Sequence, residues 1–353
     1  MPHITVEHLT QFVTDLFAAE GVPEPDAHVV AANLVGANLT AHDSHGVRSV
    51  RRYVAAIRDG LVNLQPTMRF RSDRPASVAL DVDWGFGAVG MEMLLASLFG
   101  KAATQGVATG TLHHCNDLGC IGNFTARAAE RGFVALMTVN DGGANPSVAP
   151  FGGKRALLST NPLSAAFPVA GQWPICIDMA TSTCAGERAI MAAAQNQSLP
   201  PEFMVDGHGR PSTDPKDLFG NPAGALLPFG GPHAGHKGFA LSLIVDLLSG
   251  ALSGAGCSGH DGRDAQGAFF MCLNIEAFTS AEAFDREVKE FITKIQSTPR
   301  ANGVEEIFIP GQMEARAKQD NMTHGLAIPQ PVWQELTDLA ESLEVPVPTL
   351  ITS

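Results

Sequence analysis

The sequence lacks the features that mark several special classes of protein. Its six cysteines form no CxxC pair, which favours reduced, mostly buried thiols in a cytosolic protein over a metal or disulfide framework. Lys and Arg number 23 against 36 Asp and Glu, a formal net charge of −13, so broad binding to nucleic acid or anionic membrane is disfavoured. No apolar run approaches the ~18 residues of a membrane span, and the first residues lack the pattern of a signal peptide. We therefore predict a cytoplasmic protein.

The composition and the apolar spacing predict an α/β protein. Hydrophobic residues make up 45% of the 353 residues and charged residues 17%, an ordinary globular balance. Apolar residues recur at helical spacing near both ends of the chain, whereas the middle alternates short β-rich runs with Gly-rich turns and helices. We predict a helical domain built from residues 1–70 and 280–353 around an α/β domain of residues 71–279. Residues 197–235, rich in Pro and Gly, are predicted to be a long loop.

The segment Gly85–Gly90 matches GxGxxG, the pattern of a dinucleotide-binding turn, and follows an apparent strand at Ser77–Val82. The Rossmann pattern also needs an acidic residue about 20 residues further on. None occurs between Met93 and Asn116, and the next apparent strand ends in Leu112-His113-His114. We interpret these glycines as a tight turn that lets a helix pack close to a strand.

The strongest candidate for chemistry is Asp43-Ser44-His45-Gly46, followed by Arg48. A histidine beside a hydroxyl can give up or take a proton near neutral pH, and an arginine can clamp a carboxylate with two parallel hydrogen bonds. The same spacing also permits a helix cap formed by Asp43 or Ser44, with His45 on the surface. The histidines of the chain are scattered without ligand spacing, so no metal site is predicted.

Five further groups are weaker. Cys115–Gly122 follows a strand and opens a helix, where free backbone N–H groups suit a phosphate or carboxylate and where an aspartate N-cap is the alternative. Polar groups at 159–162 and 177–182 stand at strand ends, where ligands often bind. Lys237 stands at the head of an apolar helix, where the helix dipole disfavours a cation unless an anion is bound. Residues 309–312 form a turn before a helix.

Taken together and in this order, these groups resemble the malate/L-lactate/sulfolactate dehydrogenase family of nicotinamide-dependent 2-hydroxyacid dehydrogenases. That family also contains ureidoglycolate dehydrogenases and piperideine-2-carboxylate reductases. The resemblance covers nearly the entire chain and includes DSHGV, NDLGCIGNF, STNP, IDMATS, GHKGFALSLIVDLLSGALSGAG and IPGQMEAR. It implies a non-Rossmann layered α/β cofactor domain, a helical domain, pairing as a homodimer, and hydride transfer between NAD or NADP and C2 of a small 2-hydroxy or 2-oxo acid.

The resemblance also implies roles for individual residues. His45 is the proton donor or acceptor with Ser44 as its relay partner, and Asp117 and Arg188 hold further catalytic positions. The substrate, a small carboxylate, is expected to contact Arg48, Arg52, Thr160 and Glu187. Cofactor contacts are expected from Leu118, Gly119, Cys120, Ile121, Asp178, Met179, Ala180, Thr181, Ser182, His236, Lys237, Gly238, Pro310, Gly311 and Gln312.

Three positions depart from the family pattern. Asp117 stands where many members carry His, and Ser49 where many carry a substrate-binding Arg, so Arg48 is the candidate for the carboxylate clamp. Ten residues after the aspartate of IDMATS, Arg188 favours an anionic 2-oxo acid, whereas a one-residue slip places Glu187 there and suits a cationic imine. A cyclic-imine reductase using NADPH is therefore the alternative function, and a non-catalytic protein descended from the enzyme is a third.

Overall fold

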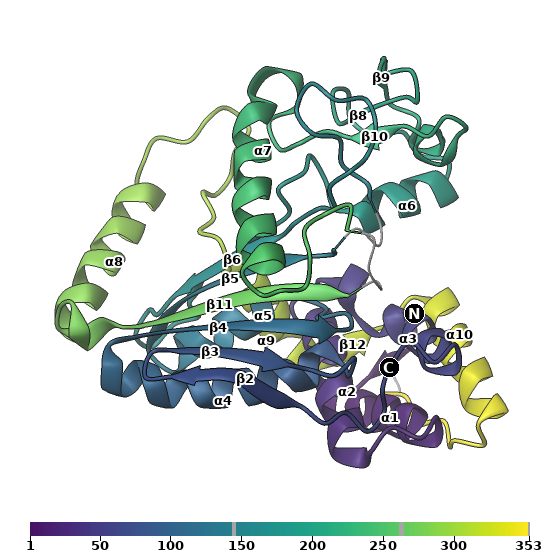
Figure 1. The fold of residues 1–353 in the computed structure, drawn as a ribbon, viewed down its shortest axis with the longest axis horizontal. Helices are drawn as coiled ribbons and strands as arrows, with labels where there is room; N and C mark the ends of the chain where they lie inside the picture. The colour runs from purple at the N-terminus through teal and green to yellow at the C-terminus, as the bar shows by residue number, and fades with distance from the viewer. Residues whose placement is uncertain (143–145, 261–264, 352–353) are drawn as a thin grey trace.

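The computed structural model of the chain describes residues 1–142, 146–260 and 265–351. Its centre is a seven-stranded mixed sheet with the strand order β2-β3-β4-β11-β5-β6-β7 (Figure 1). The strands are β2 (Arg69–Arg74), β3 (Ser77–Asp81), β4 (Val107–Cys115), β5 (Phe133–Asn140), β6 (Leu163–Phe167), β7 (Ile175–Met179) and β11 (Gln266–Asn274). Within this sheet only β3 and β4 pair in parallel. A Rossmann sheet is mostly parallel, so the prediction of an α/β protein of another topology is confirmed.

Helices cover the sheet. Helices α4 (Gly87–Gln105) and α5 (Gly122–Glu130) pack against its strands, and Figure 1 shows α7 (Gly231–Asp246) standing on the opposite side from α4. A π-helical turn, Leu247–Ala251, continues α7 and contacts β11 and β5. Apolar side chains of α4, α5 and the sheet form one hydrophobic core.

The glycines of the Gly85–Gly90 segment allow α4 to pack closely against its neighbours. A Cβ added to Gly87 would lie 2.4 Å from the backbone oxygen of Asn116, and one added to Gly90 would lie 2.7 Å from the side chain of Val82. Side chains at these two positions would force α4 away from its neighbours. The glycines therefore bring α4 against β3 and against the turn after β4, as predicted.

Both ends of the chain share a second hydrophobic core. It joins α1 (Val6–Ala19), α2 (Glu24–Leu39), α3 (Val50–Arg58) and α10 (Gln330–Ser342), which lie together at the lower right of Figure 1. The rings of Phe12 and Trp333 lie 5.8 Å apart in it, and β1 (His3–Ile4) pairs with β12 (Leu326–Ala327). The helices predicted near both ends are confirmed, whereas the division into domains stays a prediction.

The remaining elements surround these two cores. They are α6 (Gly186–Ala194), the small sheet β8 (Met204–Val205), β9 (Pro211–Ser212) and β10 (Ala225–Leu226), the 3-10 helices Pro215–Phe219 and Ile275–Ala277, α8 (Ala281–Gln296) and α9 (Gln312–His324). The prediction of a loop over 197–235 was wrong in part, because it contains the small sheet and the first turn of α7. Lys237 lies in the second turn of α7 rather than at its head, so the helix dipole gives no argument for a bound anion there. Among the helices of the described residues, none is both long enough and apolar enough to cross a membrane.

Candidate functional site

The turn that carries His45 is held in place by Asn38 at the end of α2. The Asn38 amide nitrogen donates to Asp43 at 2.6 Å, and its oxygen accepts the backbone N–H of Val47 at 2.8 Å. A Cβ added to Gly46 would lie 2.2 Å from that same oxygen. Glycine at position 46 therefore lets one amide clamp the turn on both sides of His45.

Ser44 and His45 interact directly. The Ser44 Oγ lies 2.9 Å from the His45 Nδ1, and both residues are partly buried. Neither of the short 3-10 helices here, Asp43–His45 and Val47–Ser49, has a side-chain cap hydrogen bond, which argues against the helix-cap interpretation. With Nδ1 engaged, Nε2 is the nitrogen through which the ring can exchange a proton with a ligand.

Asp117 forms an ion pair with Arg52, which reaches it from α3. The other oxygen of the carboxylate accepts the backbone N–H of Gly119 at 2.7 Å. Burial by itself raises the pKa of Asp117, but Arg52, the Gly119 N–H and the nearby His45 outweigh it, so the pKa lies below its usual range. Asp117 is therefore a charged group beside His45 at neutral pH.

Tyr53 contacts the ion pair of Arg52 and Asp117. Its ring is buried, stacks on Phe86 at 6.1 Å and lies 5.2 Å from the Arg52 guanidinium. Burial and the Asp117 charge raise the pKa of Tyr53 well above its usual value. Tyr53 therefore stays neutral, packs against Phe86 and donates a hydrogen bond to the Asp117 carboxylate.

The opposite wall of the site comes from α6. The Arg48 Nη1 lies 2.8 Å from the Met191 Sδ, which brings the start of α3 against α6. Glu187, in the first turn of α6, is half-buried and its charge acts on Arg52. Arg188, the next residue, is exposed. Arg48, Arg52 and Glu187 thus meet near His45, and no contact in the described residues places Arg188 with them.

Asp178 provides a second carboxylate near His45. It projects from β7, and its Oδ2 accepts the backbone N–H of Gly122 at 2.8 Å, at the start of α5. A Cβ at Gly122 would lie 2.8 Å from this oxygen, so the approach depends on glycine. Burial raises the pKa of Asp178, although the Gly122 N–H and the rings of His42 and His45 favour its charged form.

Three backbone N–H groups of the turn between Asp117 and Gly122 already donate to side chains of the protein. The Leu118 N–H donates to the Gln266 side chain at 2.8 Å, and those of Gly119 and Gly122 donate to the two aspartates. The side chains of Leu118, Cys120 and Ile121 are buried. The prediction that free N–H groups of this turn suit a phosphate was therefore wrong for these three donors.

Other predicted contacts lie along β7 and the loop that follows it. The Thr181 hydroxyl donates to the Asn161 carbonyl at 2.9 Å, and the Thr160 carbonyl accepts the Thr181 N–H at the same distance. The Ser182 hydroxyl donates to the Cys184 carbonyl at 2.6 Å, while Met179 and Ala180 are partly buried. These hydroxyls shape the loop that leads from β7 to α6.

Two predicted groups lie on separate elements. The Pro310 carbonyl accepts the Cys176 N–H at 3.1 Å, and Gly311, at φ +92°, brings the turn before α9 against β7. Gln312 accepts the N–H of Ile309 at 3.1 Å. On α7, His236 and Lys237 are exposed, and Gly238 lets the helix pack against the backbone of Phe229.

A cavity of about 350 Å³ lies between α2, α5 and α9. Asn33 lines it and also donates to the Leu118 carbonyl at 3.0 Å, so the cavity borders the Asp117–Gly122 turn, and His45 is not among its lining residues. Its charged residues are paired, Arg127 with Glu92 and Lys318 with Glu130. We place the reactive site at His45 instead, because a histidine, two carboxylates and arginines converge there.

The comparison with known families identifies the family of the chain. The malate/L-lactate dehydrogenase family model matches residues 4–337.

The chain belongs to the malate/L-lactate dehydrogenase family.

Relatives span the same length as this family member. It is 35% identical to an L-lactate dehydrogenase of Cupriavidus necator over 98% of this chain and 99% of the relative. It is 33% identical to a malate dehydrogenase of Pyrococcus abyssi, over 97% of this chain and 95% of that protein. The structure of delta1-piperideine-2-carboxylate reductase from Pseudomonas syringae pvar. tomato matches with a TM-score of 0.86 and 27% identity, covering 96% and 100% of the two chains. The protein is an oxidoreductase that acts on CH–OH donors, as its family does.

Sequence reasoning assigned no role to three residues that this family member uses to build the site. Asn38 clamps the His45 turn, Met191 seats Arg48, and Tyr53 packs under Arg52. Of these, only Tyr53 carried a signal, because it is the single tyrosine of the chain and directly follows Arg52. The contacts of Asn38 and Met191 depend on tertiary placement that no local pattern shows.

Proposed function

We propose that the protein interconverts a small 2-oxo acid and the matching 2-hydroxy acid, with His45 as the proton donor and acceptor. The contact between Ser44 and the His45 Nδ1 is the observation that supports this most directly. A hydroxyl can donate or accept, so Ser44 can hold the ring in both of its protonation states. The Nε2 is then presented to the oxygen at C2 of the substrate.

Arg48 is proposed to bind the substrate carboxylate. Arg52 already forms an ion pair with Asp117, whereas the described contact of Arg48 is with the thioether of Met191, a weak acceptor. Its guanidinium therefore keeps donors for a carboxylate, which it can bind with two parallel hydrogen bonds. Thr160, whose methyl group lies near Gly186 at the start of α6, is proposed to line the same pocket.

A nicotinamide cofactor, NAD or NADP, is proposed to lie along β7. This strand is an edge of the sheet and each of its five residues is partly exposed, which leaves a face for a ligand between His45 and the turn at Pro310–Gln312. When bound, the nicotinamide supplies or accepts the hydride. Of the chain's own groups, His45, Asp117 and Asp178 border this face, and the His45 ring acts on the charge of both carboxylates.

The test is steady-state kinetics with oxaloacetate, pyruvate and sulfopyruvate, each with NADH and with NADPH. The variant His45→Asn should lower kcat by ~10²–10⁴ while cofactor binding, followed by fluorescence titration, stays near the wild-type value. His208→Asn removes an exposed histidine and serves as the matched control. Wild-type turnover by His45→Asn would reject the assigned role. Comparing kcat/KM for the two cofactors selects between NAD and NADP.

A cyclic-imine reductase is the second candidate function. The half-buried Glu187 beside Arg52 favours it, because a carboxylate in the pocket stabilises a cationic ring nitrogen. A reductase of piperideine-2-carboxylate also has this fold. If this reaction is the true one, NADPH-dependent turnover is confined to the imine, and Glu187→Gln lowers kcat/KM for it. If turnover occurs only with 2-oxo acids, the imine function is rejected.

We further propose that the protein is a cytoplasmic homodimer. Large apolar side chains are exposed on α7 and α8, including Ile244, Leu247 and Phe291. Surfaces of this kind are typical of subunit interfaces. A non-catalytic role for the chain is disfavoured by the assembled site around His45.

A further inference from the structure

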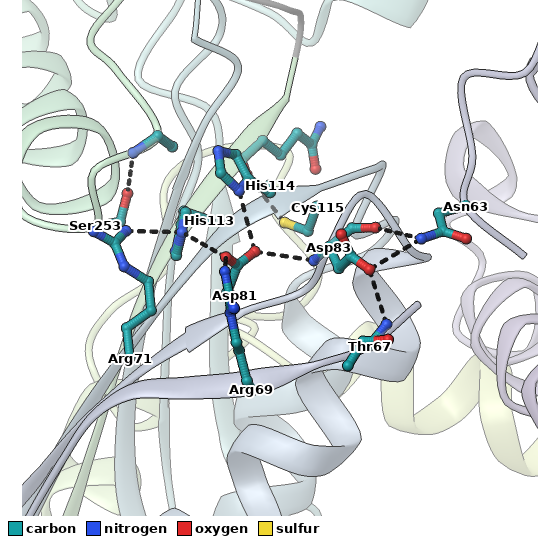
Figure 2. Close-up of polar contacts among 12 residues, drawn as sticks. Asn63, Thr67, Arg69, Arg71, Asp81, Asp83, His113, His114, Cys115 and Ser253 are labelled. Atoms are coloured by element: carbon teal, nitrogen blue, oxygen red, sulfur yellow. Dashed lines mark hydrogen bonds and ion pairs between the residues drawn. The ribbon is translucent and has the colours of Figure 1, made fainter. Parts of the chain in front are cut away.

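A polar cluster outside the proposed active site lies at the end of β3 and β4. Asp81 and His113 are register partners across these parallel strands, and His114 follows. Figure 2 shows the Asp81 carboxylate in contact with both imidazole rings, whose centroids lie 4.4 Å apart. Each of the three residues offers one ligand atom, and these atoms all lie within 4.8 Å of one another.

The backbone is bent so that both histidines reach Asp81. Successive side chains of a strand normally point to opposite faces. His114 has a φ of +50°, and the neighbouring Asp83 and Trp84 have φ of +51° and +62°. The Trp84 ring stacks on His114 at 4.8 Å. Non-glycine residues rarely adopt positive φ, and such strain collects at sites that use it.

Two acceptor atoms face each other in the cluster. The Arg71 Nη1 lies 2.8 Å from the His113 Nε2. A guanidinium only donates, so this nitrogen carries a lone pair. The Asp81 Oδ2 lies 3.5 Å from the same nitrogen. The Arg69 Nη2 lies 3.8 Å from this carboxylate oxygen, so two guanidinium groups offset the repulsion between the two acceptors. A metal ion shared by both acceptors would take over this role.

The distances suit a small metal ion. Ligand atoms at about 2.0–2.1 Å from a tetrahedral Zn²⁺ are about 3.3 Å apart. The His113 Nε2 lies 3.5 Å from the Asp81 Oδ2 and the His114 Nδ1 lies 3.1 Å from the Asp81 Oδ1, so each ring meets a different oxygen of the carboxylate. One ligand atom from each residue lies within 4.8 Å of the other two, so modest side-chain shifts would bring all three to one ion.

The ligand set selects the class of metal and leaves an entry path. Two imidazoles and a carboxylate favour a divalent transition metal over Ca²⁺ or Mg²⁺, which prefer all-oxygen sites. Asp81 and His113 are buried, whereas the His114 side chain is 41% exposed. A metal can therefore enter beside His114, with water completing its coordination.

We propose that Asp81, His113 and His114 bind one divalent transition metal ion, with Zn²⁺ as the reference ion. The ion would displace Arg71, whose guanidinium lies beside the ligand nitrogen in the metal-free chain. It would fasten the turn after β3 to the end of β4, where the Asn116 side chain already donates to the Trp84 carbonyl at 2.6 Å.

Calorimetric titration of the untagged, EDTA-treated full chain with Zn²⁺ tests the proposal. We expect one strong site per chain, and Co²⁺ in its place should give the visible absorption of tetrahedral coordination. His114→Asn removes a ligand but keeps a residue that tolerates positive φ, and it should weaken Zn²⁺ binding at least tenfold. His8→Asn, on the exposed face of α1, is the matched control and should bind as the wild type does.

Arg71→Met gives a second, opposite expectation. Removing the competing guanidinium should tighten Zn²⁺ binding. Added Zn²⁺ should also raise the melting temperature of Arg71→Met and of the wild type, but not that of His114→Asn. Absence of a Zn²⁺ site in the wild type, or equal binding by His114→Asn, overturns the proposal. Weaker binding by Arg71→Met contradicts the position given to the ion.

Discussion

Asp117 and Asp178 show how two carboxylates near one histidine acquire opposite properties. Both are largely enclosed, which raises the pKa of a carboxyl group. Asp117 has the Arg52 guanidinium as a partner and its pKa falls, whereas the Asp178 carboxylate has one backbone N–H and a thiol as its contacts and its pKa rises. The charge of the nearest partner therefore decides the direction.

We expect the stability of Asp117→Asn and Asp178→Asn to depend on pH with opposite signs. A carboxyl group whose pKa is lowered by folding stabilises the protein at pH values above its ordinary pKa of about 3.9. This stabilisation is lost as the pH falls through the pKa of the group in the folded protein. Asp117→Asn should therefore cost about 1–2 kcal/mol at pH 7, and the cost should shrink in acid. A raised folded pKa works in reverse, so Asp178→Asn should gain stability relative to the wild type as the pH rises above about 4.

Urea unfolding of the wild type and both variants between pH 3 and 7 measures these differences. In Asp178→Asn, the oxygen of the new amide side chain can still accept a backbone N–H, so the charge is the main change. Parallel pH profiles for the two variants would contradict the assignment of opposite shifts.

At the scale of elements, the close contact between α4 and the turn after β4 gives a second prediction. Gly87→Ala places a methyl group 2.4 Å and 2.9 Å from the backbone oxygens of Asn116 and Asp117. Since backbone cannot move aside cheaply, we expect a loss of about 1–3 kcal/mol in the free energy of unfolding. The catalytic rate should fall as well, because the Asp117 turn moves.

Gly100→Ala is the matched control in the same helix. Nothing lies within 4 Å of the added Cβ, and alanine favours the helix by about 0.5–1 kcal/mol. Urea unfolding of both variants is the measurement. If Gly87→Ala raised only the KM for the cofactor and left stability unchanged, the glycines would serve the nucleotide and the packing explanation would be wrong.

Local patterns predict most elements but not their assembly. The runs at Ser77–Val82 and 133–139 became β3 and β5, and the apolar periodicity near both ends became α1, α2, α3, α8 and α10. The strand β11 was not predicted, although it lies at the centre of the sheet. Its place between β4 and β5 depends on pairing across more than a hundred residues, which has no local signature.

In the candidate sites too, contacts between neighbours in the sequence could be predicted, whereas contacts between distant elements could not. Ser44 and His45 are adjacent in sequence, so their contact was predictable, whereas the approach of Glu187 and Met191 depends on how α6 docks. The cluster at His113 and His114 has no ligand spacing in the sequence, because adjacent strand residues normally point apart and only the positive φ of His114 reverses this. Whether Arg188 has a catalytic role stays a prediction.

For the whole molecule, α8 gives a prediction about assembly. Of its sixteen residues none is buried, and Phe291 is 60% exposed on an otherwise amphipathic helix. If α8 contributes to the proposed dimer interface, Phe291→Glu should raise the dimer dissociation constant at least tenfold, because one buried Phe contributes about 1.5–3 kcal/mol.

Sedimentation velocity over a range of protein concentrations measures that constant. Glu290→Gln, at an exposed position of the same helix, removes a charge without changing the apolar face and should leave the dimer intact. A Phe291→Glu protein that remains dimeric at all concentrations would place the interface elsewhere, with the exposed apolar residues of α7 as the next candidate.

The central position of β11 affects how the protein must be made. Its neighbours β4 and β5 leave the ribosome more than a hundred residues earlier than Gln266–Asn274 do. Until then, the two inner edges of the nascent sheet have open backbone donors and acceptors, the kind of surface that promotes aggregation. The polypeptide therefore completes the core of its central sheet only late in translation, a stage at which chaperones that shield open strand edges would determine the yield.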